Sequence, residues 1–418
     1  MANSEHTETA LENLPTIPMG VSDWGSLQDG NYLVVDKTAK LKKLVAYRSV
    51  FLARPRRMGK STLCSMLYEM FAHGKESFAG QAIYELWTEK TYPVILLSFK
   101  TIAVKNANDF EISLRETLVA AFSEAGFPEV KSFEQSRTLN GFLRQFNSIA
   151  QQHKLVFLID EWDYSLSHSD DNAEAFNIFM GVLEIFYSWL RELPKLRFVL
   201  VTGIMRYRET SLFTGQDIQD LSMDPDFADL LGYTQEEIKQ AFAQYIPLAA
   251  ARMHITEEQL LEQLQLYYAG FCFDYDAFIE VYCPYAINRF FSVVKSRNKV
   301  PYFGSYWMRS ANASSALSTY VRKHALKQDE LKELCEQQFT LSYAELNAAN
   351  YFGPATFKQL LVQAGYFSIK SIAGNELDDA DDPDDPEQRK FNCAITNKDV
   401  AKEFVPVLKQ YLQELELR

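Results

Sequence analysis

The feature that most constrains the fold of this chain is a basic loop that joins an apolar run to a helical pattern. The run Ser49–Ala53 has the length of a strand that is buried on both faces, and it leads directly into Arg54–Ser61 (RPRRMGKS). A helical pattern over Ser61–Ala72 follows at once. A strand that enters a helix through such a loop is typical of α/β proteins that hold a phosphate at the helix N-terminus.

The end of this loop matches the phosphate-binding (Walker A) consensus G-x-x-x-x-G-K-[ST]. Gly59 would let the backbone approach a phosphate, Lys60 would reach the β- and γ-phosphates, and the Ser61 hydroxyl would bind Mg²⁺. Arg54 stands in place of the first glycine. Because Gly-Lys-Ser also occurs in basic surface turns that merely begin a helix, it needs support from a second motif. The expected nucleotide-binding residues of the loop are Arg54, Pro55, Arg56, Arg57, Met58, Gly59, Lys60, Ser61 and Thr62.

A second motif of the Walker B form follows further along the chain. The apolar run Leu155–Asp163 (LVFLIDEWD) ends in carboxylates. We expect Asp160 to hold Mg²⁺ through its water shell and Glu161 to orient and deprotonate the attacking water. Asp163 would either support the Mg²⁺ ligands indirectly or cap a helix. Strands that end in acids are common, but the two motifs together, both at strand ends, predict a site for ATP and Mg²⁺.

The next apolar run, Phe198–Thr202, ends in a hydroxyl group. In the additional-strand P-loop ATPases this position senses the γ-phosphate, which Thr202 could do, although it could equally be an ordinary strand terminus. Arg206 and Arg208 follow, and each is a candidate arginine finger or sensor. The alternative is that both are solvated bases. An arginine that acts on a neighbouring subunit would require a homo-oligomer.

Strand-like runs that alternate with helical patterns predict an α/β fold with a parallel sheet covered on both faces. The fold class is a P-loop NTPase of the AAA+/STAND-like type, followed by a helical lid and a winged-helix-like α+β module. Val94–Phe99 is the remaining strand of the sheet. The remaining helical patterns of the core are Ala107–Ala125, Ser136–Gln152 and Asn172–Leu193.

We divide the chain into a tail (1–16), an ATPase core (17–225), a helical lid (226–320) and the winged-helix-like module (321–418). No strand is expected in the lid, whose helical patterns are Thr234–Tyr245, Thr256–Ala269 and Pro284–Val294. The module has helical patterns at Leu326–Gln337, Ser342–Asn350, Thr356–Ala364 and Asp399–Leu415, and strand-like runs at Tyr366–Ile369 and Lys390–Ile395.

The charge of the chain is segregated. The formal net charge is −13, and the run Glu376–Glu387 holds eight carboxylates and no base, as expected of a solvated loop. Lys37–Lys60 holds nine Lys or Arg and no acid. We assign these bases to the phosphate site, since the acidic balance does not support a nucleic-acid-binding face. Nucleic acid therefore stays a possible partner without support from the overall charge.

Three features that the sequence lacks bear on the cellular compartment of the protein. The five cysteines lack metal-ligand spacing and are typical of a reduced, cytoplasmic protein. The N-terminus lacks the apolar run of a signal peptide, and no apolar segment reaches the length of about 18 residues that a membrane span needs. We therefore expect a cytoplasmic protein without a membrane partner.

The motifs, together with further short stretches, resemble the predicted AAA-ATPase-like family, whose members often carry a C-terminal nuclease-like domain of the PD-(D/E)XK type. The likeness spans about residues 15–400. Its matching stretches are IPMGVSDW (17–24), YLVVDKT (32–38), FLARPRRMGKS (51–61), LIDEWD (158–163), VTGIMRYRETSLFTG (201–215), LLGYTQEEI (230–238), YYAGFCF (267–273), VYCPYAI (281–287), SYW (305–307) and LLVQAGYFSIK (360–370).

The resemblance implies an ATPase core, a lid and a winged-helix-like segment. The RPRRMGKS loop is itself typical of the family, so Arg54 is not a disabling change. Pro284 would lie against the adenine, and Asp36 and Lys37 would help to position the nucleotide. The plain alternatives are a proline at a helix start and a surface turn.

Two departures from the family pattern stand out. The usual D-E-Y-D-x-P is here Asp160–Ser165 (DEWDYS). The chain also stops where the nuclease-like domain usually begins, and no strand bearing E-x-K follows an acidic residue. We therefore expect no nuclease activity from this chain.

Three functions stay open. The first is a Mg²⁺-dependent ATPase that couples hydrolysis to a conformational change, and Glu161 favours it. The second is a slow or non-hydrolysing nucleotide switch or scaffold for a protein partner. The third is a DNA-associated ATPase of a nuclease-linked system.

Overall fold

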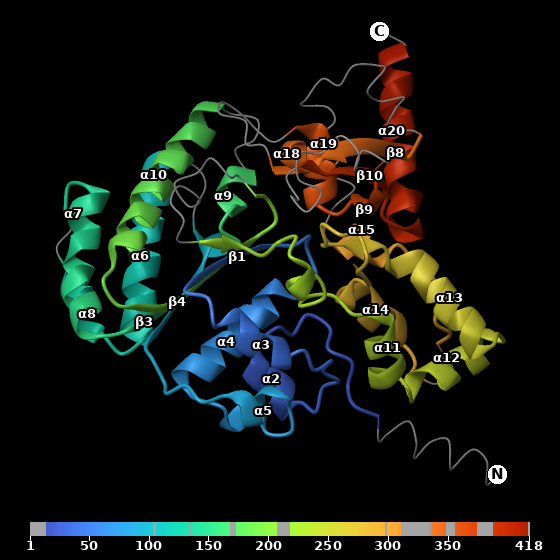
Figure 1. Cartoon of the computed structure of the whole chain (residues 1–418), viewed down its shortest axis with the longest axis horizontal. Coiled ribbons are helices and arrows are strands. Elements are labelled where there is room, and N and C mark those ends of the chain that lie inside the picture. The colour runs from blue at the N-terminus through green and yellow to red at the C-terminus, as the bar shows by residue number, and fades with distance from the viewer. Residues whose placement is uncertain are drawn as a thin grey trace.

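The computed structural model describes residues 14–102, 106–133, 136–167, 173–206, 218–296, 299–310, 334, 336–347, 356–373 and 388–416. At its centre lies a parallel five-stranded sheet with the strand order β2-β3-β4-β1-β5 (Figure 1). All four expected apolar runs form strands of this sheet, and a short edge strand joins them. The strands are β1 (Ser49–Ala53), β2 (Val94–Ser98), β3 (Leu155–Asp160), β4 (Leu196–Gly203) and β5 (Gln219–Asp220).

The sheet is covered by helices on both faces, as the sequence predicts. Alternate strand residues point to opposite faces, so Val50 and Leu52 belong to one apolar core while Phe51 and Ala53 belong to the other. One face is covered by α2 (Trp24–Asp29), α3 (Ala39–Leu44), α4 (Lys60–Ala72) and α5 (Ile83–Leu86). The other face is covered by α6 (Ala107–Glu124), α7 (Leu139–Leu143), α8 (Asn147–Gln152) and α10 (Ala173–Glu192), while α9 (Tyr164–Ser167) follows β3.

The helix expected over Ser136–Gln152 is interrupted. It begins only at Leu139, because the Thr138 side chain accepts a hydrogen bond from Gly141 N and so caps α7. The short 3₁₀ helix η4 (Arg144–Phe146) then separates α7 from α8.

The segment that follows the sheet is mainly helical. Its helices are α11 (Gln235–Ala241), α12 (Tyr245–Met253), α13 (Glu257–Tyr268), α14 (Pro284–Phe291) and α15 (Tyr306–Ser310). Thr234 and Thr256 cap α11 and α13 through complete capping boxes, which confirms the predicted starts of these helices.

The expectation that this segment contains no strand is wrong. Two-residue strands, β6 (Phe271–Cys272) and β7 (Glu280–Val281), form an antiparallel hairpin. Strands this short leave no periodicity in the sequence. The connecting turn is organised by buried Asp274, whose carboxylate accepts the N–H groups of Asp276, Phe278 and Ile279.

The C-terminal part contains a three-stranded antiparallel sheet in the order β8-β10-β9. β9 and β10 match the predicted strand-like runs. The segment that forms β8 was expected to be a loop between two helices. The predicted helix at Leu326–Gln337 lies mostly outside the described residues, and the acidic run Glu376–Glu387 lies wholly outside them. The elements are β8 (Gln338–Ser342), α18 (Tyr343–Asn347), α19 (Phe357–Gln363), β9 (Phe367–Ile372), β10 (Lys390–Ile395) and α20 (Lys398–Glu416).

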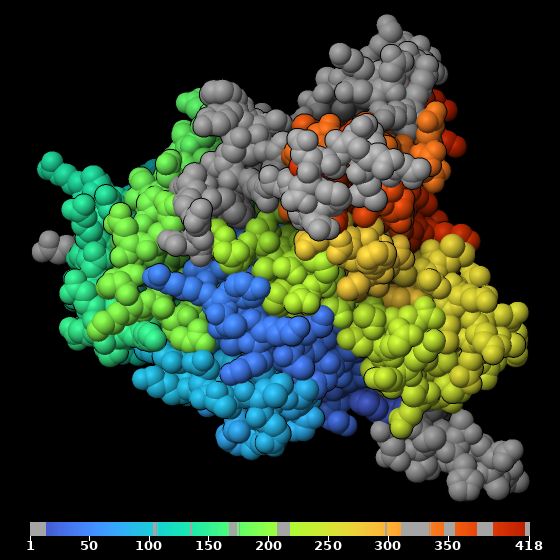
Figure 2. Space-filling view, viewed as in Figure 1, coloured from blue at the N-terminus to red at the C-terminus, as the bar shows by residue number. Residues whose placement is uncertain are grey.

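The N-terminal segment, blue in Figure 2, lies against the yellow-green helices that follow the sheet. Asn288 in α14 donates a 3.2 Å hydrogen bond to Pro18 O, and the Tyr245 hydroxyl of α12 donates to Pro15 O. These contacts hold the N-terminal segment between the sheet and the lid helices. Within the described part of the chain, no helix combines the length and apolar character needed to cross a bilayer.

Candidate functional site

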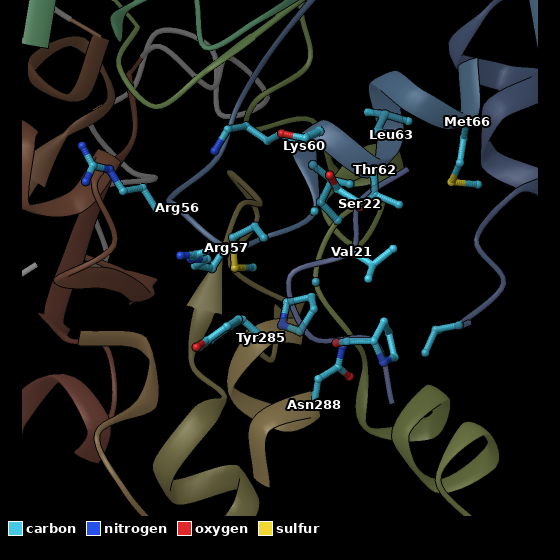
Figure 3. A pocket seen from close by; sticks show the side chains of 18 of the residues that line it. Val21, Ser22, Arg56, Arg57, Lys60, Thr62, Leu63, Met66, Tyr285 and Asn288 are labelled. Carbon is cyan, nitrogen blue, oxygen red and sulfur yellow. The ribbon is translucent and has the colours of Figure 1, made fainter. Parts of the chain in front are cut away.

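A cavity of about 690 Å³ opens at the carboxyl end of β1, between the loop Arg56–Thr62 and α14 (Figure 3). Its walls also include the N-terminal stretch from Pro18 to Ser22 and the residue that follows β3, Glu161. The volume lies in the range of pockets that enclose small organic ligands. The predicted loop and the predicted carboxylate therefore face one common space.

The phosphate loop turns sharply into α4. Gly59 has φ +103°, a left-handed value that a residue with a side chain adopts only under strain, and its carbonyl accepts the first backbone hydrogen bond of α4, from Leu63 N. Lys60 is buried, and its ammonium group donates to Arg54 O at 2.8 Å and Pro55 O at 2.9 Å. Burial lowers the pKa of Lys60, while the charge of nearby Asp160 opposes that shift.

The loop and the end of β3 are joined by a direct hydrogen bond. Ser61 Oγ donates to Asp160 Oδ2 at 2.6 Å, and Thr202 Oγ1 donates to Asp160 Oδ1 at 2.5 Å. A hydroxyl and a carboxylate oxygen side by side are suitable protein ligands for Mg²⁺, which prefers oxygen and takes its remaining ligands from phosphates and water. Among the described residues, no group of three or more Asp, Glu, His or Cys forms an all-protein metal site.

Glu161 lines the cavity in a strained conformation. Its φ is +54°, and its Oε2 is buried and has no hydrogen-bond partner among the described residues. Burial raises the pKa of Glu161, as does the charge of Asp160, while Lys100 and Lys60 lower it. A carboxylate of the cavity wall with an oxygen that lacks a hydrogen-bond partner among the described residues is suited to accept a proton.

Asp163 helps to shape the same edge of the sheet. Its carboxylate accepts the N–H groups of Ile204 and Met205, the latter at 2.8 Å. A side chain on neighbouring Gly203 would collide with Trp162 and Asp163, so this strand end needs glycine. Asp163 therefore anchors the chain after β4, and it also lines the cavity.

The structure corrects the expected role of the Arg54 side chain. Arg54 is fully buried, and its guanidinium donates to Ala53 O, Ser222 O and Phe227 O while it lies 4.3 Å from the centre of the Phe273 ring. The side chain fills the protein interior and does not line the cavity.

Pro55 does not line the cavity either. Its ring packs closely on Gly365, where an added Cβ would approach it to 2.8 Å. Arg54 and Pro55 therefore contribute to the loop interior through their carbonyl groups, which Lys60 contacts.

Of the site residues expected at the end of β4 and just beyond it, the two that the structure describes, Thr202 and Arg206, do not line the cavity. Thr202 donates to Asp160 and so orients it, while a γ-phosphate-sensing role for Thr202 stays a prediction. Arg206 is 3% exposed and forms an ion pair with Asp220 at 2.8 Å, which keeps its guanidinium away from the cavity. Arg208 lies outside the described residues.

The residues implied by the family resemblance divide into two groups. Pro284 and Lys37 line the cavity, although the Lys37 ammonium is also paired with Glu237 at 2.7 Å. Asp36 does not line the cavity. Its carboxylate accepts Thr38 N and Ala82 N and so holds the chain before α3.

Five of the nine bases in the stretch Lys37–Lys60 are paired with acids or buried. Besides Lys37, Lys40 pairs with Asp229 and Lys43 with Asp226, while Arg54 and Lys60 are buried. The partners of these lysines are acids of residues 226–237. Because these acids lie far away in the sequence, the pairing could not be predicted from it. This pairing weakens the case for a nucleic-acid surface here.

Sequence reasoning missed several residues of the cavity. Val21, Tyr285 and Asn288 line its apolar end (Figure 3), and Lys100 lies near Glu161. Lys100 could have been found, because it follows β2 at the same sheet edge where Ser98 pairs with Asp160. The other three come from the N-terminal segment and α14, whose approach to the loop is a tertiary contact.

Comparison with known proteins gives a family and a curated relative. Residues 18–213 match the family model "Predicted AAA-ATPase". A protein of Azotobacter chroococcum mcd 1 described as "Uncharacterized protein in vnfD 5'region" is 24% identical over 361 residues. The match covers 85% of this chain and 64% of the relative, so the chain spans less than two thirds of that relative's length.

Solved structures give weaker likenesses. Cdc6p from Pyrobaculum aerophilum is 12% identical with a TM-score of 0.27, and the ORC2 protein of Aeropyrum pernix (ADPNP–ADP complexes) is 11% identical with a TM-score of 0.40. Each alignment covers 94% of this chain and 98% of the other, but both likenesses are too weak to assign a property to it. The family match is the stronger finding: it supports an AAA-ATPase-like domain over residues 18–213 of this chain.

Proposed function

We propose that this protein binds ATP with Mg²⁺ and hydrolyses it, and that the bound nucleotide changes how the lid sits on the core. The observation that carries the proposal is the convergence of Lys60, Ser61 and Glu161 on one cavity, with Asp160 bonded to Ser61 beneath it. The family of residues 18–213 supports a P-loop ATPase in general. Hydrolysis and the conformational coupling are the steps that we add.

The polar end of the cavity supports phosphate binding. Lys60 and the N-terminus of α4 supply positive charge and N–H donors, which suit the β- and γ-phosphates. Ser61 and Asp160 would hold Mg²⁺, which neutralises charge on the phosphates as the terminal bond breaks. Glu161 would orient a water molecule and take its proton on Oε2, the oxygen that lacks a partner among the described residues.

The apolar end of the cavity supports binding of a nucleobase. Val21, Val34, Leu231 and Pro284 form apolar walls there, and Asn288 supplies a polar amide. Apolar walls with few polar groups are typical of sites for planar ring systems. We assign this end to the adenine.

The origin of the walls supports coupling between nucleotide and conformation. The polar wall comes from the proposed core (17–225), whereas Pro284 and Asn288 come from the proposed lid (226–320), with the winged-helix-like module at 321–418 beyond it. A ligand that contacts both parts favours the arrangement in which they are close.

The test is Mg²⁺-dependent ATP hydrolysis by the wild type beside Glu161→Gln, with nucleotide binding measured on the same samples. We expect turnover in the wild type only and equal binding in both proteins. Equal turnover in both would remove Glu161 from the base role. Absence of nucleotide binding by the wild type would overturn the whole proposal.

A slow nucleotide switch is the second candidate, and the Arg206–Asp220 ion pair favours it. With Arg206 held away from the cavity, fast turnover would need an arginine from a partner protein or a second copy. Binding with very slow turnover would support this candidate. A DNA-associated role is less favoured, because three of the five lysines of the basic stretch are paired with acids and a fourth is buried. Salt-dependent DNA binding would test it.

A further inference from the structure

Two successive carbonyls of the phosphate loop are contacted by residues from outside the core. Trp307 Nε1 in α15 donates to Arg56 O at 3.0 Å. Cys283 Sγ, just before α14, contacts Arg57 O at 3.7 Å, within the range of a weak thiol hydrogen bond. Both donors come from the lid, whereas Lys60 contacts the two preceding carbonyls, those of Arg54 and Pro55.

These contacts fix the direction of the peptide N–H groups. In a trans peptide the C=O and the N–H point in opposite directions, and the described chain contains no cis peptide. Because Arg56 O faces Trp307, the N–H of Arg57 points away from the tryptophan. Because Arg57 O faces Cys283, the N–H of Met58 points away from the cysteine.

The conformation of Arg57 brings the two N–H groups together. Its φ of +68° is left-handed, which is strained for arginine and persists only where surrounding contacts impose it. Successive N–H groups around a left-handed residue form a concave anion site. Among the described residues, none accepts a hydrogen bond from the N–H of Arg57, Met58 or Gly59, and all three residues line the cavity.

We propose that Trp307, assisted by Cys283, is a positioning residue that holds the Arg56–Met58 peptides as an anion site for the β-phosphate of the nucleotide. The inference rests on the proposed nucleotide binding. Trp307 does not touch the phosphate. It acts through the Arg56 carbonyl, which it keeps turned outward.

Trp307 is in turn fixed by the C-terminal part of the chain. The buried Asp399 carboxylate in α20 accepts Trp307 N at 2.8 Å and Met308 N at 3.3 Å. Trp307 is 2% exposed, and its indole ring packs edge-on against Phe271 and Tyr366. Movement of α20 would therefore reach the Arg56 carbonyl of the phosphate loop through Trp307.

The test uses Trp307→Phe, which keeps an aromatic ring but removes the N–H donor. Trp189→Phe is the matched control, because Trp189 is also buried and also donates through Nε1, to Asn147 in the core on the opposite face of the sheet. Affinities for ADP and AMP are measured by competition with a fluorescent ATP analogue, and thermal unfolding reports folding. AMP lacks the β-phosphate, so the ADP/AMP affinity ratio isolates the anion site from general damage.

We expect Trp307→Phe to lower the ADP/AMP affinity ratio about tenfold, as for one lost hydrogen bond that leaves a buried acceptor unpaired, and Trp189→Phe to leave it unchanged. An unchanged ratio in a folded Trp307→Phe protein would overturn this inference and leave the proposed function intact. A wild type that binds no nucleotide would overturn both.

A second pair of variants covers the case in which Trp307→Phe does not fold. Cys283→Ala removes the donor to Arg57 O, whereas Cys283→Ser retains one. We expect the ratio to fall in the alanine variant and to be restored in the serine variant. Equal ratios in the two variants would contradict the inference.

Discussion

Ser61 and Asp160 are 99 residues apart in the sequence, yet the Ser61 hydroxyl lies 2.6 Å from Asp160 Oδ2. The bond joins the first turn of α4 to the carboxyl end of β3. The second oxygen of Asp160 accepts a hydrogen bond from the hydroxyl of Thr202, so β4, which lies between β3 and β1 in the sheet, orients the same carboxylate. The site thus depends on the relative positions of three segments, which are β3, β4 and the phosphate loop.

This arrangement predicts the effect of Thr202→Val. The variant keeps the shape of the side chain but removes the donor to Asp160, so we expect several-fold more Mg²⁺ to be needed for half-maximal ATP binding, with Mg²⁺-independent binding unchanged. A Mg²⁺ titration at fixed ATP measures this. Loss of discrimination between ATP and ADP at a normal Mg²⁺ requirement would instead support a phosphate-sensing role for Thr202.

Lys60→Ala should weaken ATP binding by on the order of 100-fold, because a charged donor to the phosphates is lost along with two loop contacts. Lys42→Ala is the control, since Lys42 lies in the same basic stretch but does not line the cavity. Calorimetric titration with ATP distinguishes the two variants. Equal affinities for both would remove the phosphate loop from the site.

Arg54→Gly restores the glycine of the phosphate-loop consensus, and we expect it to destabilise the protein without tightening ATP binding. The change leaves the buried carbonyls of Ala53, Ser222 and Phe227 without their donor. The free energy of unfolding should fall by on the order of 3 kcal/mol. Urea unfolding measures the effect, and a variant of wild-type stability would show that the buried guanidinium is dispensable.

Asp399 predicts a pH dependence of stability. Burial raises the pKa of Asp399 to about 6, although the N–H groups of Trp307 and Met308 oppose the shift. The folded state therefore holds this proton more tightly than the unfolded state, whose pKa is about 4. The stabilisation by this group is complete below about pH 4 and is lost as pH rises through about 6.

Asp399→Asn should remove this contribution. The difference in unfolding free energy between the wild type and the variant should change by on the order of 2 kcal/mol between pH 4 and pH 7, in the direction that favours the wild type at low pH. Urea unfolding at several pH values gives the two curves. Parallel curves would show that Asp399 titrates normally.

The sequence predicted the parts of the fold that depend on local pattern. The four apolar runs became β1 to β4, and α11 and α13 begin where the helical patterns from Thr234 and Thr256 indicated. Strands of two residues leave no such pattern, so β5, β6 and β7 were missed. β8 was missed although Phe339 and Leu341 alternate with exposed residues, because the four residues between the two predicted helical patterns also fit a loop.

Only part of the site was predicted, because the sequence shows local patterns but not tertiary contacts. The loop Gly59–Ser61 and the carboxylates Asp160 and Glu161 are fixed by their positions at strand ends, and the structure brings them together. The direction of the Arg54 side chain depends on Ser222 and Phe227, which approach it only in the folded chain. The contact of Trp307 with the loop spans 251 residues and could not be read from local sequence.

The most direct test of the central claim is a single-turnover experiment with protein in excess over radiolabelled ATP and Mg²⁺, for the wild type and Glu161→Gln. Single turnover removes any dependence on product release, so it also detects a slow enzyme. The account predicts that the wild type converts bound ATP to ADP, while Glu161→Gln retains ATP at least a hundredfold longer, as expected for loss of a general base. Equal conversion by both proteins, or intact ATP on the wild type throughout, would contradict it.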